Sequence, residues 1–310
     1  MMFEQLGLIG CGLMGGSFAL ALKRAGLVRR VVGYSKSPLT LSRARALGVI
    51  DVEAPSALLA VSGADLVLLA LPVAATEDTF KAVRHLLGAQ ALLMDVGSTK
   101  ADVVAAARRT LGAHLPQFVP AHPIAGKEVA GIEHADADLY RGCQVILTPL
   151  PETAPQQSAR AQQLWQALGA QVRLMDAQDH DAAYAAVSHL PHLLAFAAVN
   201  ALGQQRAGRQ WLELAGPGFR DFSRIAASDP VIWRDILQAN AAEVLAQSRQ
   251  FRAALDALEA AMQHSDGSAL QKLIAHASAL RSQWQPASGA TAPDSIFAPC
   301  TKPPSSTCPP

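Results

Sequence analysis

A glycine-rich turn near the start of the chain has the residue types and spacing that a dinucleotide phosphate requires. Residues 10–15 read GCGLMG and directly follow the apolar residues 6–9. Glycines let the backbone turn tightly and approach a pyrophosphate, and the helix expected from residue 13 offers free N–H groups and a positive dipole end. A glycine turn without a ligand is the alternative, but a strand before it and a helix after it favour a cofactor site. We therefore predict a pyrophosphate contact at Gly10, Gly12, Leu13, Met14 and Gly15.

The end of the second expected strand indicates which dinucleotide binds. Residues 33–37 read GYSKS, so this neighbourhood lacks the Asp or Glu that usually holds the ribose 2′-hydroxyl of NAD. Lys36 and Arg43 are suited to a 2′-phosphate, and Ser35 can add a hydrogen bond. Both bases could instead be solvated surface charges. Because the missing acid is the stronger observation, we predict that NADP is preferred and keep NAD as the alternative.

Two further loops hold polar residues at places where ligands of α/β sheets bind. Residues 95–100 read DVGSTK at the carboxyl end of an expected strand, the edge at which open parallel sheets bind ligands. An ordinary loop in which Ser98 or Thr99 caps the next helix is the plainer alternative. Residues 121–128 read AHPIAGKE, on a loop after residues 118–119, and Pro123 gives His122 a defined direction. We expect both loops at one site.

A third group of polar residues lies in the second half of the chain. Residues 188–192 read SHLPH, and residues 220–224 read RDFSR. His189 and His192 are three apart, so they share a helix face if the helix continues through Pro191. Neither a carboxylate nor a cysteine completes a convincing ligand set around them, and we propose no metal.

Strands and helices alternate in the first part of the chain and give way to helices alone. Apolar runs predict strands at 6–9, 31–32, 66–71, 91–95 and 144–148, with helices at 13–25, 102–111 and 156–168 between them. This order predicts a doubly wound parallel sheet of the Rossmann type. Helices are expected at 179–204, 231–262 and 268–284. We predict a dinucleotide-binding domain at 1–177, a helical substrate and dimerisation domain at 178–285, and a disordered tail at 286–310.

The composition excludes several classes of partner. Half of the 310 residues are hydrophobic, and 26 basic against 25 acidic residues leave a net charge of +1. This balance gives no reason to expect nucleic acid or an anionic membrane. The four scattered cysteines form no CxxC pair, and the first residues lack a signal-peptide pattern. Residues 182–205 carry no Asp, Glu, Lys or Arg, but their histidines and proline favour a buried core or dimer helix over a membrane span. We expect a cytoplasmic protein.

Six segments together resemble one enzyme family. In chain order they are GLIGCGLMGGSFALALK, DVGSTK, HPIAGKE, DADLYRG, SHLPH and GFRDFSRIAASDPVIWRDI. They resemble the prephenate and arogenate dehydrogenases of tyrosine biosynthesis, over about residues 6–284. The first segment is shared with many dehydrogenases, whereas the last two are specific. The resemblance implies oxidative decarboxylation of prephenate to 4-hydroxyphenylpyruvate, or of arogenate to tyrosine, with hydride transfer to NAD(P), and a homodimer joined through the helical domain.

The resemblance also implies a role for each candidate site residue. His122 matches the family histidine that accepts a proton from the substrate C4 hydroxyl, for which neutral imidazole is suited. Ser98 matches the serine that orients that histidine. Arg224 matches the arginine that pairs with the ring carboxylate, where a planar guanidinium fits well. His192 matches a histidine of the substrate pocket, with His189 as a companion. Arg220 would meet the side-chain carboxylate or be an exposed charge.

Two other readings stay open at this point. A β-hydroxyacid dehydrogenase also has a glycine-rich start, but the expected interdomain helix at 179–204 has no lysine of the kind those enzymes share. A regulator that binds NADP without catalysis would keep the glycine turn and have no need of His122, Ser98 and Arg224. We therefore expect an enzyme.

Overall fold

The first half of the chain folds around a six-stranded parallel sheet. The computed structural model describes residues 2–127 and 129–285. The sheet order is β3-β2-β1-β4-β5-β6, and each neighbouring pair is parallel. The strands are β1 Phe3–Ile9, β2 Val28–Tyr34, β3 Val52–Glu53, β4 Leu66–Leu69, β5 Leu92–Asp95 and β6 Phe118–Val119. The sheet is Rossmann-type and doubly wound, as the alternation of apolar runs predicts.

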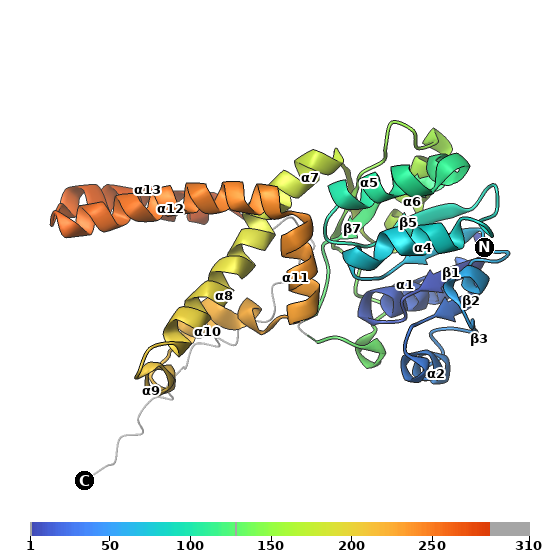
Figure 1. The fold of residues 1–310 in the computed structure, drawn as a ribbon, viewed down its shortest axis with the longest axis horizontal. Helices are drawn as coiled ribbons and strands as arrows, with labels where there is room; N and C mark the ends of the chain where they lie inside the picture. The colour runs from blue at the N-terminus through green and yellow to red at the C-terminus, as the bar shows by residue number, and fades with distance from the viewer. Residues whose placement is uncertain (1, 128, 286–310) are drawn as a thin grey trace, which may run out of the picture.

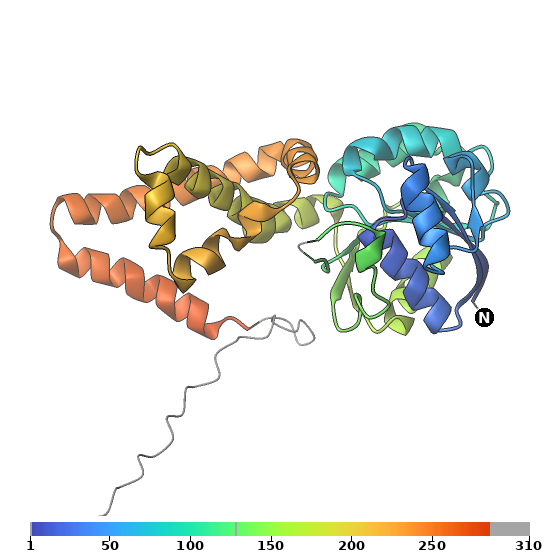
Figure 2. The ribbon, with the colours of Figure 1, turned by 90° about the horizontal axis from the view of Figure 1, so that it is seen from below.

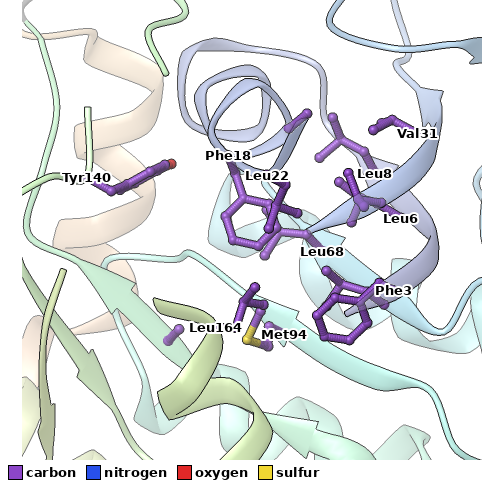
Figure 3. Close-up of a cluster of buried hydrophobic side chains, with 14 of the residues drawn as sticks. Phe3, Leu6, Leu8, Phe18, Leu22, Val31, Leu68, Met94, Tyr140 and Leu164 are labelled. Atoms are coloured by element: carbon purple, nitrogen blue, oxygen red, sulfur yellow. The ribbon is translucent and has the colours of Figure 1, made fainter. Parts of the chain in front are cut away.

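Helices cover both faces of this sheet (Figure 1). They are α1 Leu13–Arg24, α2 Pro38–Ala46, α3 Ala57–Ala60, α4 Thr76–Val83, α5 Ala101–Thr110 and α6 Pro155–Ala167, with short 3-10 turns η1 Val73–Ala75, η2 Gly112–Gln117 and η3 Ile132–His134. Two buried clusters of apolar side chains result, one on each face. Figure 3 shows Phe18 and Leu22 of α1 beside Leu8 and Leu68 of the strands. The packed sheet holds its carboxyl edge, where the site lies, in a fixed shape.

A second, smaller sheet corrects one expectation from the sequence. The predicted strand at 144–148 does not join the parallel sheet. It forms β8 Gln144–Leu147, which pairs antiparallel with β7 Ala121–Pro123 and parallel with β9 Gln171–Leu174. His122, predicted on a loop, therefore lies within β7, opposite Ile146 of β8. A strand with paired neighbours holds the His122 backbone more firmly than a loop would.

The second half of the chain is helical. It comprises α7 Ala177–Tyr184, the π-helical turn η4 Ala185–His189, α8 Leu190–Gly203, α9 Gly208–Glu213, α10 Pro217–Ser223, η5 Arg224–Ala227, α11 Pro230–Ala239, α12 Ala241–Gln263 and α13 Gly267–Gln283. In Figure 2, α12 and α13 form a hairpin whose turn lies far from the α/β unit. The predicted tail at 286–310 lies outside the described residues.

The expected single helix at 231–262 is in fact two helices, α11 and α12, which is a second correction. They meet at Asn240, whose φ of −108° and ψ of 28° depart from helical values. The Asn240 amide is buried and donates to the carbonyl of Asp181 at 2.8 Å. The apolar repeat continues through Asn240, so the sequence pattern does not reveal the break. The break goes with a contact between Asn240 and Asp181, which is distant in sequence.

Candidate active site between the sheet edge and the helices

The glycine turn has the tight packing that a dinucleotide cradle requires. Gly10 has φ +98°, and a Cβ there would lie 2.1 Å from the carbonyl oxygen of Ala70. A Cβ on Gly15 would lie 2.1 Å from the carbonyl oxygen of Gly10, whereas one on Gly12 would meet nothing within 4 Å. Gly10 and Gly15 thus bring strand and helix together, and Gly12 leaves open space at the start of α1. These features fit a pyrophosphate at the α1 N-terminus.

A cavity of about 440 Å³ extends from this turn toward the helical half of the chain. Its walls bring together the predicted residues Gly12, Leu13, Met14 and Ser98 with Trp233. Other lining residues come from the segments after β4 and β5, from the loop after β7, and from α11; they include Ala70, Val96, Ala125, Gly126, Lys127 and Ile236. The cavity thus runs along the carboxyl edge of the sheet, where parallel sheets bind their ligands.

His122 lies among a group of rings, in the strand just before the loop that lines this cavity. Its Nδ1 is 2.8 Å from Nε2 of His180 on α7. The ring of Tyr184 packs edge-on against His122, with centroids 4.8 Å apart. Burial lowers the pKa of His122 well below its usual value, and His180, Lys100 and His189 act in the same direction. Its imidazole is therefore neutral at neutral pH, the form that can accept a proton.

The chain of hydrogen bonds continues from His180 to a buried carboxylate. Nδ1 of His180 lies 2.8 Å from Oδ1 of Asp181. Asp181 also accepts from the backbone N–H groups of Lys100 and Ala101, each at 2.9 Å. Burial acts to raise the pKa of Asp181, but these hydrogen bonds outweigh it and lower the pKa. Burial lowers the pKa of His180 against the opposing effect of Asp181. At neutral pH, Asp181 is thus charged and His180 neutral.

A buried ion pair fixes the backbone just before His122. Lys100 and Asp95 are almost fully buried and form a salt bridge. The Lys100 ammonium also donates to the carbonyl of Ala121 at 2.8 Å, and Asp95 accepts from the N–H of Ala121 at 3.2 Å. Both backbone groups of Ala121 are therefore held by one pair of charges. This clamp sets the position from which the His122 side chain leaves β7.

The π-helical turn brings the two histidines of SHLPH to one tryptophan. The helix continues past Pro191, and the rings of His189 and His192 both contact Trp233 of α11, with centroids 6.1 and 3.5 Å away. Nδ1 of His192 donates to the carbonyl of Ser188 at 3.0 Å, which leaves Nε2 as an acceptor. Burial lowers the pKa of His192, and Arg224 acts in the same direction, so Arg224 lies near it. His192 therefore stacks on Trp233 and lies within electrostatic range of Arg224.

Other predicted residues are placed away from the cavity walls. His189 is 1% exposed, and its Nδ1 lies 3.1 Å from the amide of Asn240. This placement corrects its expected contact with substrate to a packing role, and burial lowers its pKa to about 4. Arg220 is exposed and pairs with Asp221 at 3.5 Å. Lys36 is exposed, and Ser35 accepts a hydrogen bond from the N–H of Ser37. Arg43 pairs with Glu133 at 3.6 Å on the surface.

The orienting contact to His122 also differs from the expectation. Ser98 lines the cavity, but across residues 2–127 and 129–285 its hydroxyl forms no hydrogen bond, and His180 makes the contact predicted for Ser98. The sequence analysis did not predict three parts of this site: His180, Asp181 and the ion pair of Asp95 with Lys100. The adjacent His-Asp pair ahead of an uncharged helix is a usable signal, but its partner lies 58 residues away in sequence.

Comparison with known proteins identifies the family of this chain. The family model for the prephenate dehydrogenase nucleotide-binding domain matches residues 18–174, and the model for the dimerization domain of the same family matches residues 176–276. The chain belongs to the prephenate dehydrogenase family. It is 35% identical to a cyclohexadienyl dehydrogenase of Zymomonas mobilis, over 86% of this chain and 90% of that one. It is 33% identical to a prephenate dehydrogenase of Bacillus subtilis, over 86% and 72%.

Solved structures of this family have the same fold. Prephenate dehydrogenase from Aquifex aeolicus, in complex with hydroxyphenyl propionate and NAD⁺, gives a TM-score of 0.86 at 33% identity and covers 91% of this chain and 99% of that one. Arogenate dehydrogenase from Synechocystis gives 0.76 at 27% identity, over 90% and 99%. The match spans both halves of the chain.

Proposed function

We propose that this protein oxidatively decarboxylates prephenate, arogenate or both, with a nicotinamide cofactor, on the route to tyrosine. The observation that carries this proposal is the neutral, oriented His122, in the strand whose following loop lines a cavity that begins at the glycine turn, in a chain of the prephenate dehydrogenase family. A β-hydroxyacid dehydrogenase activity is not favoured by these relatives. In this proposal His122 accepts the proton, Arg224 with His192 beside it binds the ring carboxylate, and Ser98 is a wall residue of the cavity.

Each step is derived from residues of this chain. Nε2 of His122 accepts the proton of the C4 hydroxyl as the C4 carbon is oxidised. Gly12, Leu13 and Met14 would hold the pyrophosphate of the nicotinamide cofactor, which would supply the hydride acceptor when bound. The Arg224 guanidinium pairs with the ring carboxylate, with His192 beside it. The oxidised ring then releases this carboxylate as carbon dioxide, and the electron pair of the broken C–C bond turns the ring into an aromatic phenolate. The phenolate oxygen takes a proton back to give the phenol. The protein needs orientation and one proton acceptor, and no covalent nucleophile.

The proposal is tested with both substrates against both cofactors. Purified protein is assayed with prephenate and arogenate, each with NAD and NADP, by absorbance of the reduced nicotinamide and by carbon dioxide release. We expect turnover in at least one combination, with one carbon dioxide per reduced cofactor. Reduction without carbon dioxide would exclude the decarboxylase, and no turnover in any combination would favour the regulator.

The cofactor preference rests on the surroundings of the second strand. The proposed NADP preference, with NAD as second cofactor, is supported by the absence of an acid at 33–37 and by the exposed Lys36 and adjacent Ser35. Arg43 is a weaker candidate for the 2′-phosphate than the sequence suggests, because Glu133 already pairs with it. If Arg43 also bound the 2′-phosphate, the negative charge of Glu133 would repel that phosphate.

Replacing Lys36 with alanine is expected to weaken NADP and leave NAD nearly unchanged. One lost charge-assisted contact predicts a roughly tenfold rise of the NADP Kd. Titration of cofactor fluorescence measures both constants, and Lys23→Ala, which removes a lysine that pairs with Asp51, is the matched control. Equal effects of Lys36→Ala on both cofactors would show that Lys36 does not contact the 2′-phosphate.

Replacing Arg224 with alanine is expected to raise KM for the substrate by roughly 10- to 100-fold, the range of a lost charge-assisted hydrogen bond to a carboxylate. The reason is that the ring carboxylate then lacks its cation, whereas His122 remains in place. Steady-state kinetics measures this change. Arg220→Ala is the matched control, because Arg220 is exposed and already pairs with Asp221. An unchanged KM in Arg224→Ala, or an equal rise in both variants, would remove Arg224 from the carboxylate site.

We further propose a homodimer that forms through the helical half, residues 178–285, with residues 1–177 as the cofactor unit. The stretch Ala177–Gly203 is long and apolar enough to cross a membrane, and only 22% of an apolar 18-residue window within it is buried in this chain. The hairpin exposes apolar side chains as well: Leu245, Phe251, Leu255, Met262, Ile274 and Leu280. A second copy would cover these faces, so this helix need not lie in a membrane, and we propose a cytoplasmic location. A single-chain mass in light scattering would exclude the dimer.

A further inference from the structure

The strongest unassigned feature of the site is the chain of hydrogen bonds from His122 through His180 to Asp181, which we call the histidine chain. Its two side-chain links are both 2.8 Å long. His180 is fully buried, and Asp181 is 3% exposed. His180 is hydrogen-bonded to His122, and Asp181 to the backbone at the start of α5, so both side chains are engaged within the protein. Buried polar side chains are normally hydrogen-bonded, so the effect of His180 and Asp181 is exerted through the groups to which they bind.

The hydrogen-bonding capacities of the three groups determine where each proton lies. A charged carboxylate only accepts hydrogen bonds, so Nδ1 of His180 must donate to Asp181. A neutral histidine carries one N–H, and Nε2 of His180 is then an acceptor. His122 must therefore donate from Nδ1, which leaves the lone pair on its Nε2. Free histidine side chains favour the opposite tautomer, with the proton on Nε2, so this arrangement is imposed by the neighbours.

We propose that His180 is a positioning residue that fixes His122 in the tautomer whose Nε2 can take the substrate proton. Asp181 acts through His180 by holding the proton on its Nδ1. The proposal rests on the proposed function for the identity of the proton donor, but the tautomer itself does not depend on it.

The histidine chain also stabilises the charge that forms on His122. When the C4 O–H bond breaks, its proton forms a new N–H bond at Nε2 of His122, and the imidazole becomes a cation. The Nδ1–H of that cation already points at the lone pair of His180, behind which stands the Asp181 carboxylate. A hydrogen bond from a cation to such an acceptor is stronger than one from a neutral ring. A charged His180 would repel this cation and so lower the pKa of His122. Burial lowers the pKa of His180 itself, so His180 is neutral and accepts from the cation. Loss of His180 therefore makes the His122 cation less stable.

Other groups face His122 and do not replace this effect. Tyr184 of α7 packs against both rings without a hydrogen bond to either. Lys100 at the start of α5 and His189 of the π-helical turn act to lower the pKa of His122. Asp95 of β5 is engaged with Lys100 and with the backbone of Ala121. Only the histidine chain offers an acceptor to Nδ1 of His122 among the described residues.

Two variants separate hydrogen bonding from packing. His180→Phe keeps a ring of similar size and removes both hydrogen bonds. His180→Gln keeps an amide oxygen for His122 and an amide N–H for Asp181. The matched control is His114→Phe, because His114 is a half-buried histidine of η2 whose ring hydrogen-bonds to Gln117 at 3.1 Å.

The first measurement needs neither substrate nor cofactor. Nitrogen-15 NMR of histidine-labelled full-length protein distinguishes the two tautomers of His122, which is assigned by its loss in His122→Asn. We expect the proton on Nδ1 in the wild type, in His180→Gln and in His114→Phe, and a shift toward the Nε2–H form in His180→Phe. A wild-type His122 that carries its proton on Nε2 would overturn the proposal even if no variant folds well.

The second measurement is the pH profile of kcat/KM. His180→Phe is expected to lower kcat by about 10- to 100-fold, as for other lost orienting partners. Its acid limb should move to lower pH, because the cation of His122 has lost its acceptor. His180→Gln should stay within about tenfold of the wild type with the acid limb unmoved. A fall in kcat in His180→Phe without a moved limb would indicate packing alone and would contradict the proposal.

These two measurements also separate this proposal from the proposed function. If His122 has the Nδ1–H tautomer but neither substrate is turned over, the proposed role of His180 stands and the proposed dehydrogenase function is contradicted. If the wild type turns over a substrate while His122 has the Nε2–H tautomer, the proposed function stands and the proposed role of His180 is contradicted.

Discussion

Asparagine at position 122 is expected to lower kcat by about 10²–10⁴, the usual effect of a lost general base. Asparagine keeps a polar side chain of similar reach and can donate to His180, but it cannot accept a proton from the substrate. The Asp95–Lys100 clamp on Ala121 does not involve the His122 side chain, so the site should otherwise keep its shape. Steady-state kinetics with the substrate and cofactor pair of highest turnover measures the effect.

The pH profile and cofactor binding serve as controls for this variant. Burial lowers the pKa of His122, so the imidazole stays neutral until the pH falls well below the ordinary histidine range. Protonation then removes the acceptor, and kcat/KM of the wild type should decline as the pH drops through that lowered pKa. His122→Asn should lose this acid limb and keep the cofactor Kd within about twofold, because the cofactor contacts lie at the glycine turn. Wild-type turnover would exclude the role of His122.

Replacing Lys100 with methionine is expected to lower the free energy of unfolding by about 3–5 kcal/mol, the usual cost of leaving one member of a buried ion pair alone. Methionine fills a similar volume but leaves the Asp95 carboxylate, which is 2% exposed, without its cation. The carbonyl of Ala121 loses a donor at the same time. The midpoint of urea denaturation measures the change.

A double variant and an exposed lysine complete this test. Lys100→Met with Asp95→Asn removes both charges and should regain part of the lost stability, because no buried charge then lacks a partner. Lys81→Met is the control, since Lys81 pairs with Glu77 and Asp78 on the surface, and its midpoint should barely move. A midpoint of Lys100→Met equal to that of the wild type would show that the pair does not hold this edge of the sheet.

The parts of the fold with local signals could be predicted from the sequence. The first strand, the glycine turn and α1 follow one another within residues 3–24, and each has its own pattern of apolar residues or glycines. The second sheet lacks such signals. β7 spans three residues, β9 is largely exposed, and the pairing of β7 with β8 joins segments more than twenty residues apart. Short strands held by distant partners give no periodicity to detect.

The site divides in the same way. The glycine cradle and His122 stand in motifs whose residues are neighbours in sequence. His180 and Asp181 act on His122 only because α7 packs against β7 and the start of α5. His189 illustrates the opposite case, because its position beside His192 suggested a ligand contact, whereas the break at Asn240 turns it into a buried partner of that residue. Tertiary contacts, rather than residue type, decide between these roles.

The most direct test is a crystal structure of the protein with cofactor and 4-hydroxyphenylpyruvate, a product that keeps the C4 oxygen. We expect this oxygen within hydrogen-bonding distance of Nε2 of His122, with the nicotinamide next to C4 and Nδ1 of His122 still bound to His180. A C4 oxygen that contacts other groups, with His122 turned away from the ligand, would contradict the proposed function of this site.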